Sequence, residues 1–448
     1  MLNATLPIIT DLVHDAALPL TGSPSDYDHL LEFIGDARFV LLGEASHGTH
    51  EFYRQRAQIT KRLIQEKGFT VVAVEADWPD AYRVNRYVRG ASKDADAVEA
   101  LSGFKRFPAW MWRNADVLDF VGWLRSYNDS LPPDARRTGF YGLDLYSMHA
   151  SIGAVLAYLD KVDPEGARRA RHRYACFEHF GEDPQGYGYA AGLGLSHSCE
   201  SEVISQLIDL QRRAAEYARR DGRVAADDFF YAEQNARLVK NAEQYYRTMF
   251  RGRVSSWNLR DLHMAETLDS VVEHVSLQKL GAKAVLWAHN SHLGDARATQ
   301  MGKSGEWNVG QLVRQKRGRN CVLVGFTTYT GTVTAASNWG GQAERKIVRP
   351  GMPGSYESLF HEVRIPSFLL TLTPGTHVSQ GLSEPMPERA IGVIYLPESE
   401  LTSHYFQARL SDQFDAIIHF DQTRAVEPLE RTSEWGIGEP AETFPSGV

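Results

Sequence analysis

The sequence is short of cysteine, of long apolar runs and of positive charge. Its three cysteines, Cys176, Cys199 and Cys321, form no Cys-x-x-Cys pair within 448 residues, and such cysteine use is typical of a reducing compartment. No apolar run approaches the roughly 20 residues that cross a bilayer, and residues 1–20 lack the basic start and apolar centre of a signal peptide. We therefore expect a cytoplasmic protein with no segment in a membrane.

The charge balance excludes one class of partner. Lys and Arg number 48 against 56 Asp and Glu, and basic runs are as short as residues 168–173, so we expect no nucleic acid partner. Hydrophobic residues make up 43% of the chain and charged residues 23%, as in ordinary globular proteins. The length predicts one large domain with an insertion, or two lobes that share a cleft. The oligomeric state stays open.

Apolar, β-rich runs alternate with helical patterns. Residues 38–43 and 70–75 are composed like buried strands, and residues 50–67 form a helical pattern that ends on Lys67-Gly68, a basic turn followed by a capping glycine. Further strands are predicted at 138–144, 283–289, 321–329, 368–373, 390–396 and 415–420. This order predicts an α/β fold, or an α+β fold with a mixed, mainly parallel sheet flanked by helices.

One part of the chain breaks the alternation. Residues 164–250 contain charge-rich helical segments, at 199–221 and 227–250, and no convincing strand, which predicts a helical insertion. Residues 330–353, rich in Gly, Thr, Ser and Asn, are predicted to form a long functional loop. The expected division is an N-terminal part of the α/β core at 1–163, the insertion at 164–250, a C-terminal part of the core at 251–423 and a tail at 424–448.

Ionisable side chains follow four of the predicted strands. Ligands bind beyond the carboxyl ends of parallel strands, so we expect these side chains to meet in one cleft. An acidic residue after a strand can also simply cap the next helix, and for Asp144 the two interpretations are equally good. The residues at the four strand ends are Glu44 and His47, Glu75 and Asp77, Asp144, and His289 and His292.

His47 is the predicted general base. It lies three residues after Glu44, in a turn whose Gly48 permits a tight bend. Histidine titrates near neutral pH and can accept a proton from water, while a neighbouring carboxylate fixes its tautomer. A surface or purely structural histidine is the plainer alternative.

Arg56 is predicted to point inward. It lies three residues before Ile59 on the apolar face of the expected helix, whereas Arg54 points nearly opposite. An inward guanidinium near strand-end carboxylates should pair with Glu44, Glu75 or the substrate. The alternative is an arginine whose stem covers the core while its head reaches water.

The remaining assignments follow from the same picture. His289 can stabilise an oxyanion or hold water, with Asn290 as a donor, although one of the two neighbouring histidines can be structural. Tryptophans 78, 110, 112 and 339 are candidates for apolar walls, and core packing is as plausible for any one of them. We assign catalysis to His47, Glu44, Glu75, His289 and Arg56, and substrate binding to His292, Asn290, Asp77, Trp78 and Asp144.

Three other interpretations stay open. The histidines and carboxylates also suit a metal ion, but no His-Glu-x-x-His helix is present. Ser46 follows a strand and precedes a helix, yet Glu44 replaces the first glycine of the Gly-x-Ser-x-Gly elbow. A cleft that binds a cofactor such as haem through His47 or His289 without catalysis is the third. We expect no metal and no cofactor.

Four motifs, taken together and in order, resemble the erythromycin esterase family. They are residues 43–52 (GEASHGTHEF), 74–79 (VEADWP), 140–144 (FYGLD) and 287–292 (WAHNSH). The resemblance implies hydrolysis of a macrolide lactone, or a related ester, by activated water without a metal or a covalent enzyme intermediate. It also implies that the family's cleft positions are Glu44, His47, Arg56, Glu75, His289 and His292.

Overall fold

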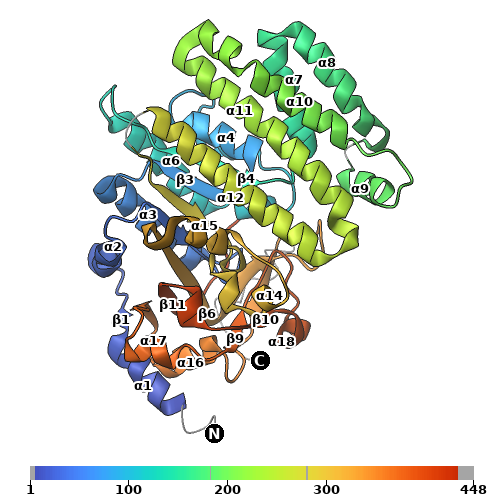
Figure 1. Ribbon diagram of the computed structural model, residues 1–448. Helices are drawn as coiled ribbons and strands as arrows, with labels where there is room; N and C mark the ends of the chain where they lie inside the picture. Colours follow the sequence, from blue (N-terminus) through green and yellow to red (C-terminus); the bar gives the residue numbers. More distant parts are fainter. Residues whose placement is uncertain (1–5, 182, 279–280, 432–448) are drawn as a thin grey trace, which may run out of the picture.

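The computed structural model describes residues 6–181, 183–278 and 281–431, and its centre is a mainly parallel sheet of nine strands (Figure 1). The strands follow the order β1-β8-β11-β6-β2-β5-β3-β4, with β7 paired to β6. Strands β1, β7 and β8 pair antiparallel with their neighbours, and the others pair parallel. The bounds are β1 Leu18–Pro19, β2 Phe39–Leu42, β3 Val71–Asp77, β4 Gly139–Asp144, β5 Ala284–Trp287, β6 Cys321–Ala335, β7 Glu344–Val348, β8 Ser367–Thr371 and β11 Ala416–Thr423. The predicted mixed, mainly parallel sheet is therefore confirmed.

Helices cover both faces of this sheet, which is why its central strands are apolar throughout. Every residue of β2 and β5 is buried, as expected where parallel strands are covered on both sides. Side chains alternate along β2: Val40 and Leu42 pack into one core cluster, while Phe39 and Leu41 pack into another. The first cluster includes residues of α3 (His50–Lys67) and α6 (Ala115–Ser130), and the second includes residues of α12 (Arg253–Gln278) and α15 (Val309–Arg317).

The helix predicted at 50–67 is confirmed to the residue as α3. Gly68 follows it in the left-handed region, with φ 70°, and its N–H bonds the carbonyl of Leu63. Glycine adopts this conformation without the steric cost that a Cβ brings.

A run of helices separates β4 from β5 along the chain, and the described residues between those two strands contain no strand. In Figure 1 these helices stack as a separate layer beside the sheet. The sequence predicted helical segments at 199–221 and 227–250. In the structure the first helix, α10, ends at Arg212, and α11 continues unbroken from Ala214 to Thr248. The elements are α7 Met148–Val162, α8 Pro164–Tyr174, η4 Ala175–Phe180, α9 Pro184–Gly192, α10 Glu200–Arg212, α11 Ala214–Thr248 and η5 Met249–Arg251, followed by α12.

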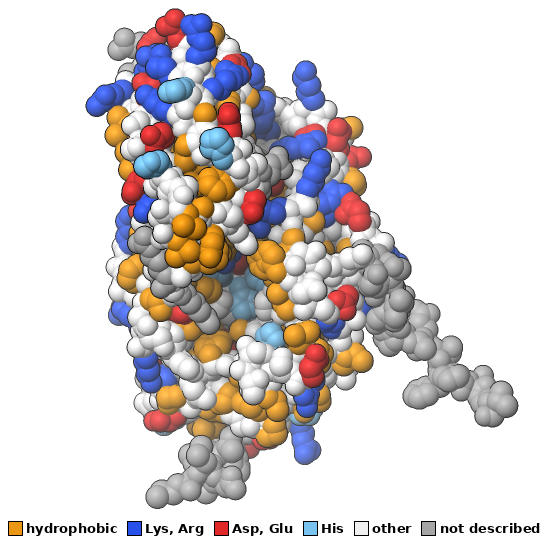
Figure 2. All heavy atoms as spheres, turned by 90° about the vertical axis from the view of Figure 1, so that its right-hand side faces the viewer, with side chains coloured by type: hydrophobic (Ala, Val, Ile, Leu, Met, Phe, Trp, Pro, Cys, Tyr) orange, Lys and Arg blue, Asp and Glu red, His pale blue; other side chains and the backbone are white. Residues whose placement is uncertain are grey.

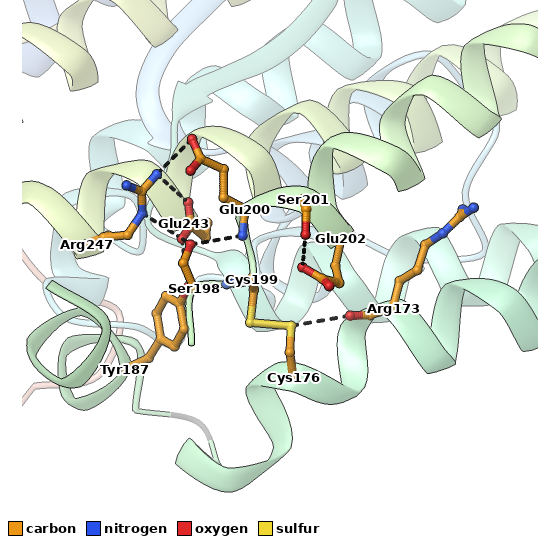
Figure 3. The surroundings of a disulfide bond; sticks show 10 residues. All are labelled: Arg173, Cys176, Tyr187, Ser198, Cys199, Glu200, Ser201, Glu202, Glu243 and Arg247. Carbon is orange, nitrogen blue, oxygen red and sulfur yellow. Dashed lines mark hydrogen bonds and ion pairs between the residues drawn. A yellow bond between two sulfur atoms is a disulfide. The ribbon is translucent and has the colours of Figure 1, made fainter. Parts of the chain in front are cut away.

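A disulfide joins Cys176 of η4 to Cys199 at the start of α10 (Figure 3). Their Cα atoms are 6.0 Å apart, although 23 residues separate them in sequence. Cys321 is free and buried. Because two of the three cysteines are paired, cysteine use gives no support to the reducing compartment that the sequence suggested. None of the described helices combines the length and apolar character that a bilayer crossing requires.

Two other local predictions are wrong. Residues 390–396 form no strand; the strand is β9 (Met386–Arg389), which pairs with β10 (Tyr405–Ala408), and the following residues make only isolated bridges. The loop expected at 330–353 is in large part a hairpin, because β6 continues to Ala335 and β7 pairs with it antiparallel. Alternating threonine and valine in β6 suit a pleated strand, and Val333 is fully buried.

The remaining helices are mostly short and lie on the connections. Those before β4 are α1 Leu6–Ala16, η2 Pro24–Tyr27, α2 Asp28–Ile34, α4 Trp78–Val88, α5 Ala97–Leu101 and η3 Ala109–Met111. Those after β5 are α13 Asn290–Leu293, η6 Ala296–Ala298, α14 Gln300–Lys303, η7 Gly318–Asn320, α16 Tyr356–Glu362, α17 His377–Gly381, η8 Pro397–Ser399, α18 Glu400–Ser403 and α19 Leu410–Gln413.

Candidate active site

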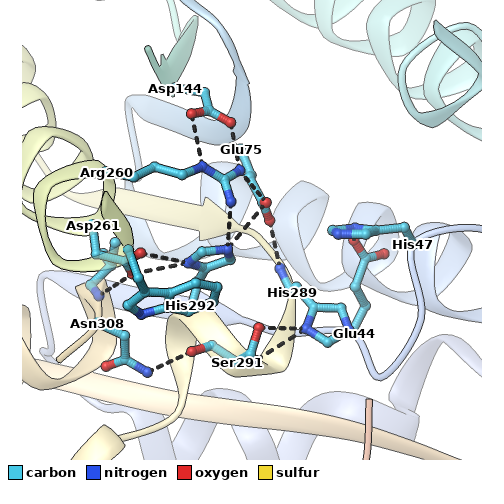
Figure 4. Close-up of polar contacts among 12 residues, drawn as sticks. Glu44, His47, Glu75, Asp144, Arg260, Asp261, His289, Ser291, His292 and Asn308 are labelled. Carbon is cyan, nitrogen blue, oxygen red and sulfur yellow. Dashed lines mark hydrogen bonds and ion pairs between the residues drawn. The ribbon is translucent and has the colours of Figure 1, made fainter. Parts of the chain in front are cut away.

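The polar strand ends predicted from the sequence lie side by side. Strands β2, β5, β3 and β4 are consecutive neighbours and run parallel, so their carboxyl ends share one edge of the sheet. Figure 4 shows the side chains that follow these strands grouped in one place, together with two residues of α12.

Glu44 connects an arginine to a histidine. Arg56 Nη2 donates to Glu44 Oε2 at 2.7 Å, and Glu44 Oε1 lies 3.0 Å from His47 Nδ1. Arg56 is fully buried, and its guanidinium lies 4.4 Å from the ring centre of Tyr53. The structure therefore contains the predicted pairing of Arg56 with Glu44, and the guanidinium of Arg56 does not reach water. The carboxylate therefore fixes one nitrogen of His47 and leaves Nε2 as the proton-accepting position.

The turn that carries His47 is held from two sides. Tyr53 donates a hydrogen bond from its hydroxyl to the carbonyl of His47 at 2.7 Å. Gly48 is required by a close approach rather than by its own dihedral angles, because a Cβ there would lie 1.9 Å from the carbonyl oxygen of Thr334 in β6. The extension of β6 thus fixes this turn against the sheet edge.

Arg260 of α12 connects three other members of the cluster. Its Nη2 donates to Glu75 at 2.8 Å and to Asp144 at 2.6 Å, and Nη1 lies 3.0 Å from His292 Nε2. Burial raises the pKa of Glu75, but His292, His47 and Arg260, with the backbone N–H of His289, outweigh burial and hold that pKa well below its usual range. Burial likewise raises and Arg260 lowers the pKa of Asp144, which is lowered in total. Both carboxylates are therefore ionised at neutral pH.

His292 is clamped between acidic groups. Its Nδ1 lies 2.9 Å from Asp261 Oδ1, its Nε2 lies 3.4 Å from Glu75, and its ring stacks on Trp257 with centres 4.5 Å apart. Burial lowers its pKa, but Asp261 and Glu75 outweigh burial, so the pKa is raised. Both ring nitrogens are engaged, which favours a positioning role for His292 over proton transfer.

His289 is a neutral imidazole beside His47. The ring centres are 4.9 Å apart, and burial, followed by the nearby His47, lowers the pKa of His289 well below its usual value. The backbone N–H of Ser291 donates to His289 Nδ1 at 3.2 Å, so the proton of the neutral ring lies on Nε2. Its own backbone N–H donates to Glu75 at 2.9 Å. His289 can therefore donate a hydrogen bond without carrying charge.

Two cavities meet at these residues. A wide one of about 620 Å³ is lined by His289 and His292, a narrow one of about 160 Å³ is lined by Asp77 and Asp144, and His47, Glu75 and Arg260 line both. In Figure 2 the molecule is hollowed here, with histidine at the floor and hydrophobic side chains on the rim. The combined space suits a ligand of several hundred daltons.

Two predicted substrate contacts lie outside the cleft. Trp78 is 1% exposed, stacks in the core against Tyr141 and Tyr231, and lines neither of the two cavities. Asn290 is fully buried, donates to the carbonyl of Phe326 at 2.8 Å and accepts from its N–H at 3.3 Å. Its amide therefore links the segment after β5 to β6.

The other predicted residues divide into those that line the cavities and those that support them. Asp77, Asp144 and His292 line a cavity, while Glu44 and Arg56 lie behind His47. Among the tryptophans proposed as walls, Trp112 and Trp339 line the narrow cavity and Trp110 lines neither of the two.

A buried glutamate beside Asn290 gives a stability prediction. Burial, and then the neighbouring Glu357, raise the pKa of Glu388 to about 8, so its neutral form fits the fold. Its contribution to stability is full below the ordinary glutamate pKa and is lost as the pH rises through 8. Between pH 5 and pH 8, Glu388→Gln should gain about 3 kcal/mol in the free energy of unfolding relative to the parent.

Urea denaturation of parent and variant at both pH values measures this difference. The exposed Glu384 provides the control, since Glu384→Gln should follow the parent at both pH values. A constant offset between Glu388→Gln and the parent would contradict the prediction.

Sequence reasoning missed Arg260 and Asp261. The buried face of α12 carries Met264 and Leu268, whereas Leu262 is 40% exposed. Asp261 lies seven residues before Leu268, and both are buried on the same face. An aspartate on an apolar stripe was the available signal, and Arg260 is its immediate neighbour.

Within the residues that the structure describes, no three histidine, cysteine, aspartate or glutamate side chains converge as metal ligands. Glu75 and Asp144 take Arg260 as their cation, and Asp261 holds His292. The charges of Glu75 and Asp144 are thus balanced by a guanidinium.

The fold and the cleft together define an α/β protein with a histidine, carboxylate and arginine centre at the strand ends. A family model for erythromycin esterase matches residues 64–423. Because this match covers most of the chain, the protein belongs to the erythromycin esterase family.

Relatives resemble the chain over most of its length. The putative hydrolase YbfO of Bacillus subtilis (strain 168) is 22% identical over 422 residues, covering 89% of this chain and 86% of that protein. Erythromycin esterase type II of Escherichia coli is 23% identical over 320 residues, covering 69% and 73%. A crystal structure of a Bacillus cereus protein has a TM-score of 0.78 at 21% identity, covering 95% and 99%. A mutant of the erythromycin esterase EreC in its open conformation has a TM-score of 0.64 at 17% identity, covering 90% and 95%.

Proposed function

We propose that this protein hydrolyses an ester, and a macrolide lactone first of all, with water activated by His47. The observation that carries the proposal is the buried Arg56–Glu44–His47 connection, whose histidine lines both cavities beside Glu75 and His289. The family to which the chain belongs, and relatives named as erythromycin esterases, support this class of substrate.

In the proposed reaction His47 Nε2 accepts a proton from water while the water oxygen bonds to the ester carbonyl carbon. The carbonyl oxygen becomes an oxyanion, which the neutral Nε2–H of His289 stabilises. The C–O bond of the ester then breaks, and the departing alkoxide takes the proton back from His47. A lactone gives one ring-opened molecule that carries both the carboxylic acid and the alcohol, an open-chain ester gives them as two products, and the enzyme is unchanged.

The neighbouring charges support these steps. Glu44 stabilises the cationic form of His47 that appears in the middle of the reaction, as a carboxylate does for a catalytic histidine. Glu75 is ionised and keeps free lone pairs that can accept a hydrogen bond from the attacking water. Arg260 holds Glu75 in place through the 2.8 Å ion pair.

Incubation of the pure protein with erythromycin, followed by mass spectrometry, tests the proposal. The expected product carries the mass of one added water. Turnover of another ester or lactone, but no macrolide, would contradict the substrate and leave the site intact. Full loss of activity on chelation with rescue by zinc would favour metal-dependent hydrolysis, and a visible absorption band of the pure protein would favour a cofactor-binding cleft.

Replacement of Ser46 separates water attack from a serine nucleophile. Ser46 is 1% exposed, its hydroxyl bonds the Thr49 hydroxyl, and it lines neither of the two cavities. Ser46→Ala should therefore keep the kcat/KM of the parent for the ester that is hydrolysed. Complete loss of activity in a folded variant, or a trapped acyl group on Ser46, would refute the water mechanism.

A further inference from the structure

The narrow cavity beside His47 combines acidic groups with aromatic walls. It is lined by the carboxyl groups of Asp77 and Asp80 and by the rings of Phe107, Trp112 and Trp339. Phe107 and Trp339 meet edge to face with centres 5.1 Å apart, and Trp339 is 57% exposed. This cavity is therefore a pocket with an aromatic entrance and an acidic interior.

One carboxylate oxygen of Asp77 is available to accept a hydrogen bond. Its Oδ2 accepts a hydrogen bond from Arg106 Nε at 2.7 Å, whereas Oδ1 is buried and has no hydrogen-bond partner among the described residues. The residue is only 5% exposed. A buried carboxylate oxygen without a donor is costly, and burial accordingly raises the pKa of Asp77; a ligand in the cavity can supply the missing donor.

Negative charge is in excess around this cavity. Four carboxyl groups line it, those of Glu75, Asp77, Asp80 and Asp144, against the two guanidiniums of Arg106 and Arg260. Arg260 is taken by Glu75 and Asp144, and Arg106 by Asp77.

Asp80 is the carboxyl group without a cation, since it makes no ion pair within the part of the chain that the structure describes. Burial, and then Asp77, raise the pKa of Asp80 to about 7 against the lowering effects of Arg106, Arg83 and Lys105. The absence of an ion pair and the raised pKa both indicate that a cation is missing beside Asp80.

The aromatic rings favour a particular kind of cation. An alkylammonium group gains from contact with aromatic faces as well as from a carboxylate. The Tyr146 ring is already covered by the guanidiniums of Arg106 and Arg260, whereas the rings of Phe107, Trp112 and Trp339 line the cavity without such a cation among the described residues. A bare metal ion would gain little from such walls, and a neutral hydroxyl group would leave the charge excess in place.

We propose that the cavity bounded by Asp77, Asp80, Phe107, Trp112 and Trp339 is a subsite for a protonated alkylamine of the substrate. The proposal rests on the proposed ester hydrolysis, since the amine then belongs to the ester that lies against His47. Asp77 Oδ1 accepts the N–H of the ammonium, Asp80 supplies the compensating charge, and the rings pack on the N-alkyl groups. Asp77 and Asp80 thereby select cationic esters over neutral ones of the same shape.

Binding of two small probes tests the subsite without any turnover. N,N-dimethylcyclohexylamine is protonated at pH 7.5, and N,N-dimethylcyclohexanecarboxamide is a neutral compound of similar size. Titration calorimetry on the full-length protein should show the amine binding at least about tenfold more tightly than the amide. The affinity for the amine should also rise from pH 6 to pH 8, because Asp80, and Asp77 whose pKa burial likewise raises, must be ionised to hold it. Equal affinities for the two probes overturn the proposal, and this comparison needs no variant.

Two charge-removing variants locate the effect. Asp80→Asn should lower the affinity for the amine about tenfold and reduce its rise with pH, while the affinity for the amide stays the same. Asp119→Asn removes the same charge from an exposed position on α6 and should change neither affinity. An Asp80→Asn protein that binds the amine like the parent overturns the assignment.

Failure of the subsite and failure of the proposed function give different results. If the amine binds through Asp80 but erythromycin gains no water, the subsite stands and macrolide hydrolysis falls. If an ester is hydrolysed with equal kcat/KM whether or not it carries an amine, hydrolysis stands and the subsite falls.

Discussion

His47→Ala should lower kcat/KM for the hydrolysed ester by roughly a thousandfold, within the usual range for loss of a general base. The alanine cannot accept the proton of the attacking water, and Glu44, held by Arg56, then has no imidazole to orient. The turn itself should persist, because its two hydrogen bonds use backbone atoms of residue 47, which alanine also has. The carbonyl accepts from the Tyr53 hydroxyl, and the N–H donates to the carbonyl of Ile391. Steady-state kinetics measures the loss, and thermal unfolding shows that the variant is folded.

His50 offers a matched control three residues along the same segment. Its Nδ1 lies 2.8 Å from Asp116, and it lines neither of the two cavities. His50→Ala should keep the parent rate. Full activity of His47→Ala, or an equal loss in both variants, would refute the assignment of His47 as general base.

Arg260→Met should cost about 3–5 kcal/mol in the free energy of unfolding at pH 7.5, as is usual when one partner of a buried ion pair is removed. It leaves Glu75 and Asp144, which are 5% and 3% exposed, without their shared cation. The stabilisation that it removes exists above the ordinary carboxyl pKa values and fades as the pH falls, because Arg260 holds both pKa values down. The difference between parent and variant should therefore stay nearly constant from pH 7.5 to about pH 5 and shrink as the pH falls below about 4.

Denaturant unfolding across this pH range measures the effect. Arg168→Met is the control, since Arg168 and its partner Glu165 are both 74% exposed, and such surface pairs contribute less than about 1 kcal/mol. An Arg260→Met protein as stable as the control, or a difference that grows toward acid pH, would contradict the buried ion pair.

The local parts of the fold were readable because they depend on near neighbours. The helical pattern of apolar residues predicted both ends of α3 and the inward direction of Arg56, and the apolar runs predicted the central strands. Residues 390–396 were as apolar as those strands but pair only through isolated bridges. Pairing depends on which neighbour the chain meets, and no local pattern records that.

The candidate site divides in the same way. Parallel strands end at a common edge, so the sequence could place His47, Glu75 and His289 near one another. It could not separate Asn290 from them, because the commitment of that amide to Phe326 arises only when β5 and β6 come together. The same holds for Trp78, whose partners include Tyr231 of α11.

The sequence by itself determined the sheet, the histidine turn and the family, since these follow from local periodicity and from motifs that stand in fixed order. Only the tertiary structure decided how the charges are balanced. Arg260 reaches Asp144 across 116 residues and Glu75 across 185, and Cys176 meets Cys199 through the packing of the helical layer. Electrostatic partners are chosen by distance in space, and a buried charge takes whichever opposite charge the fold brings within a few ångströms.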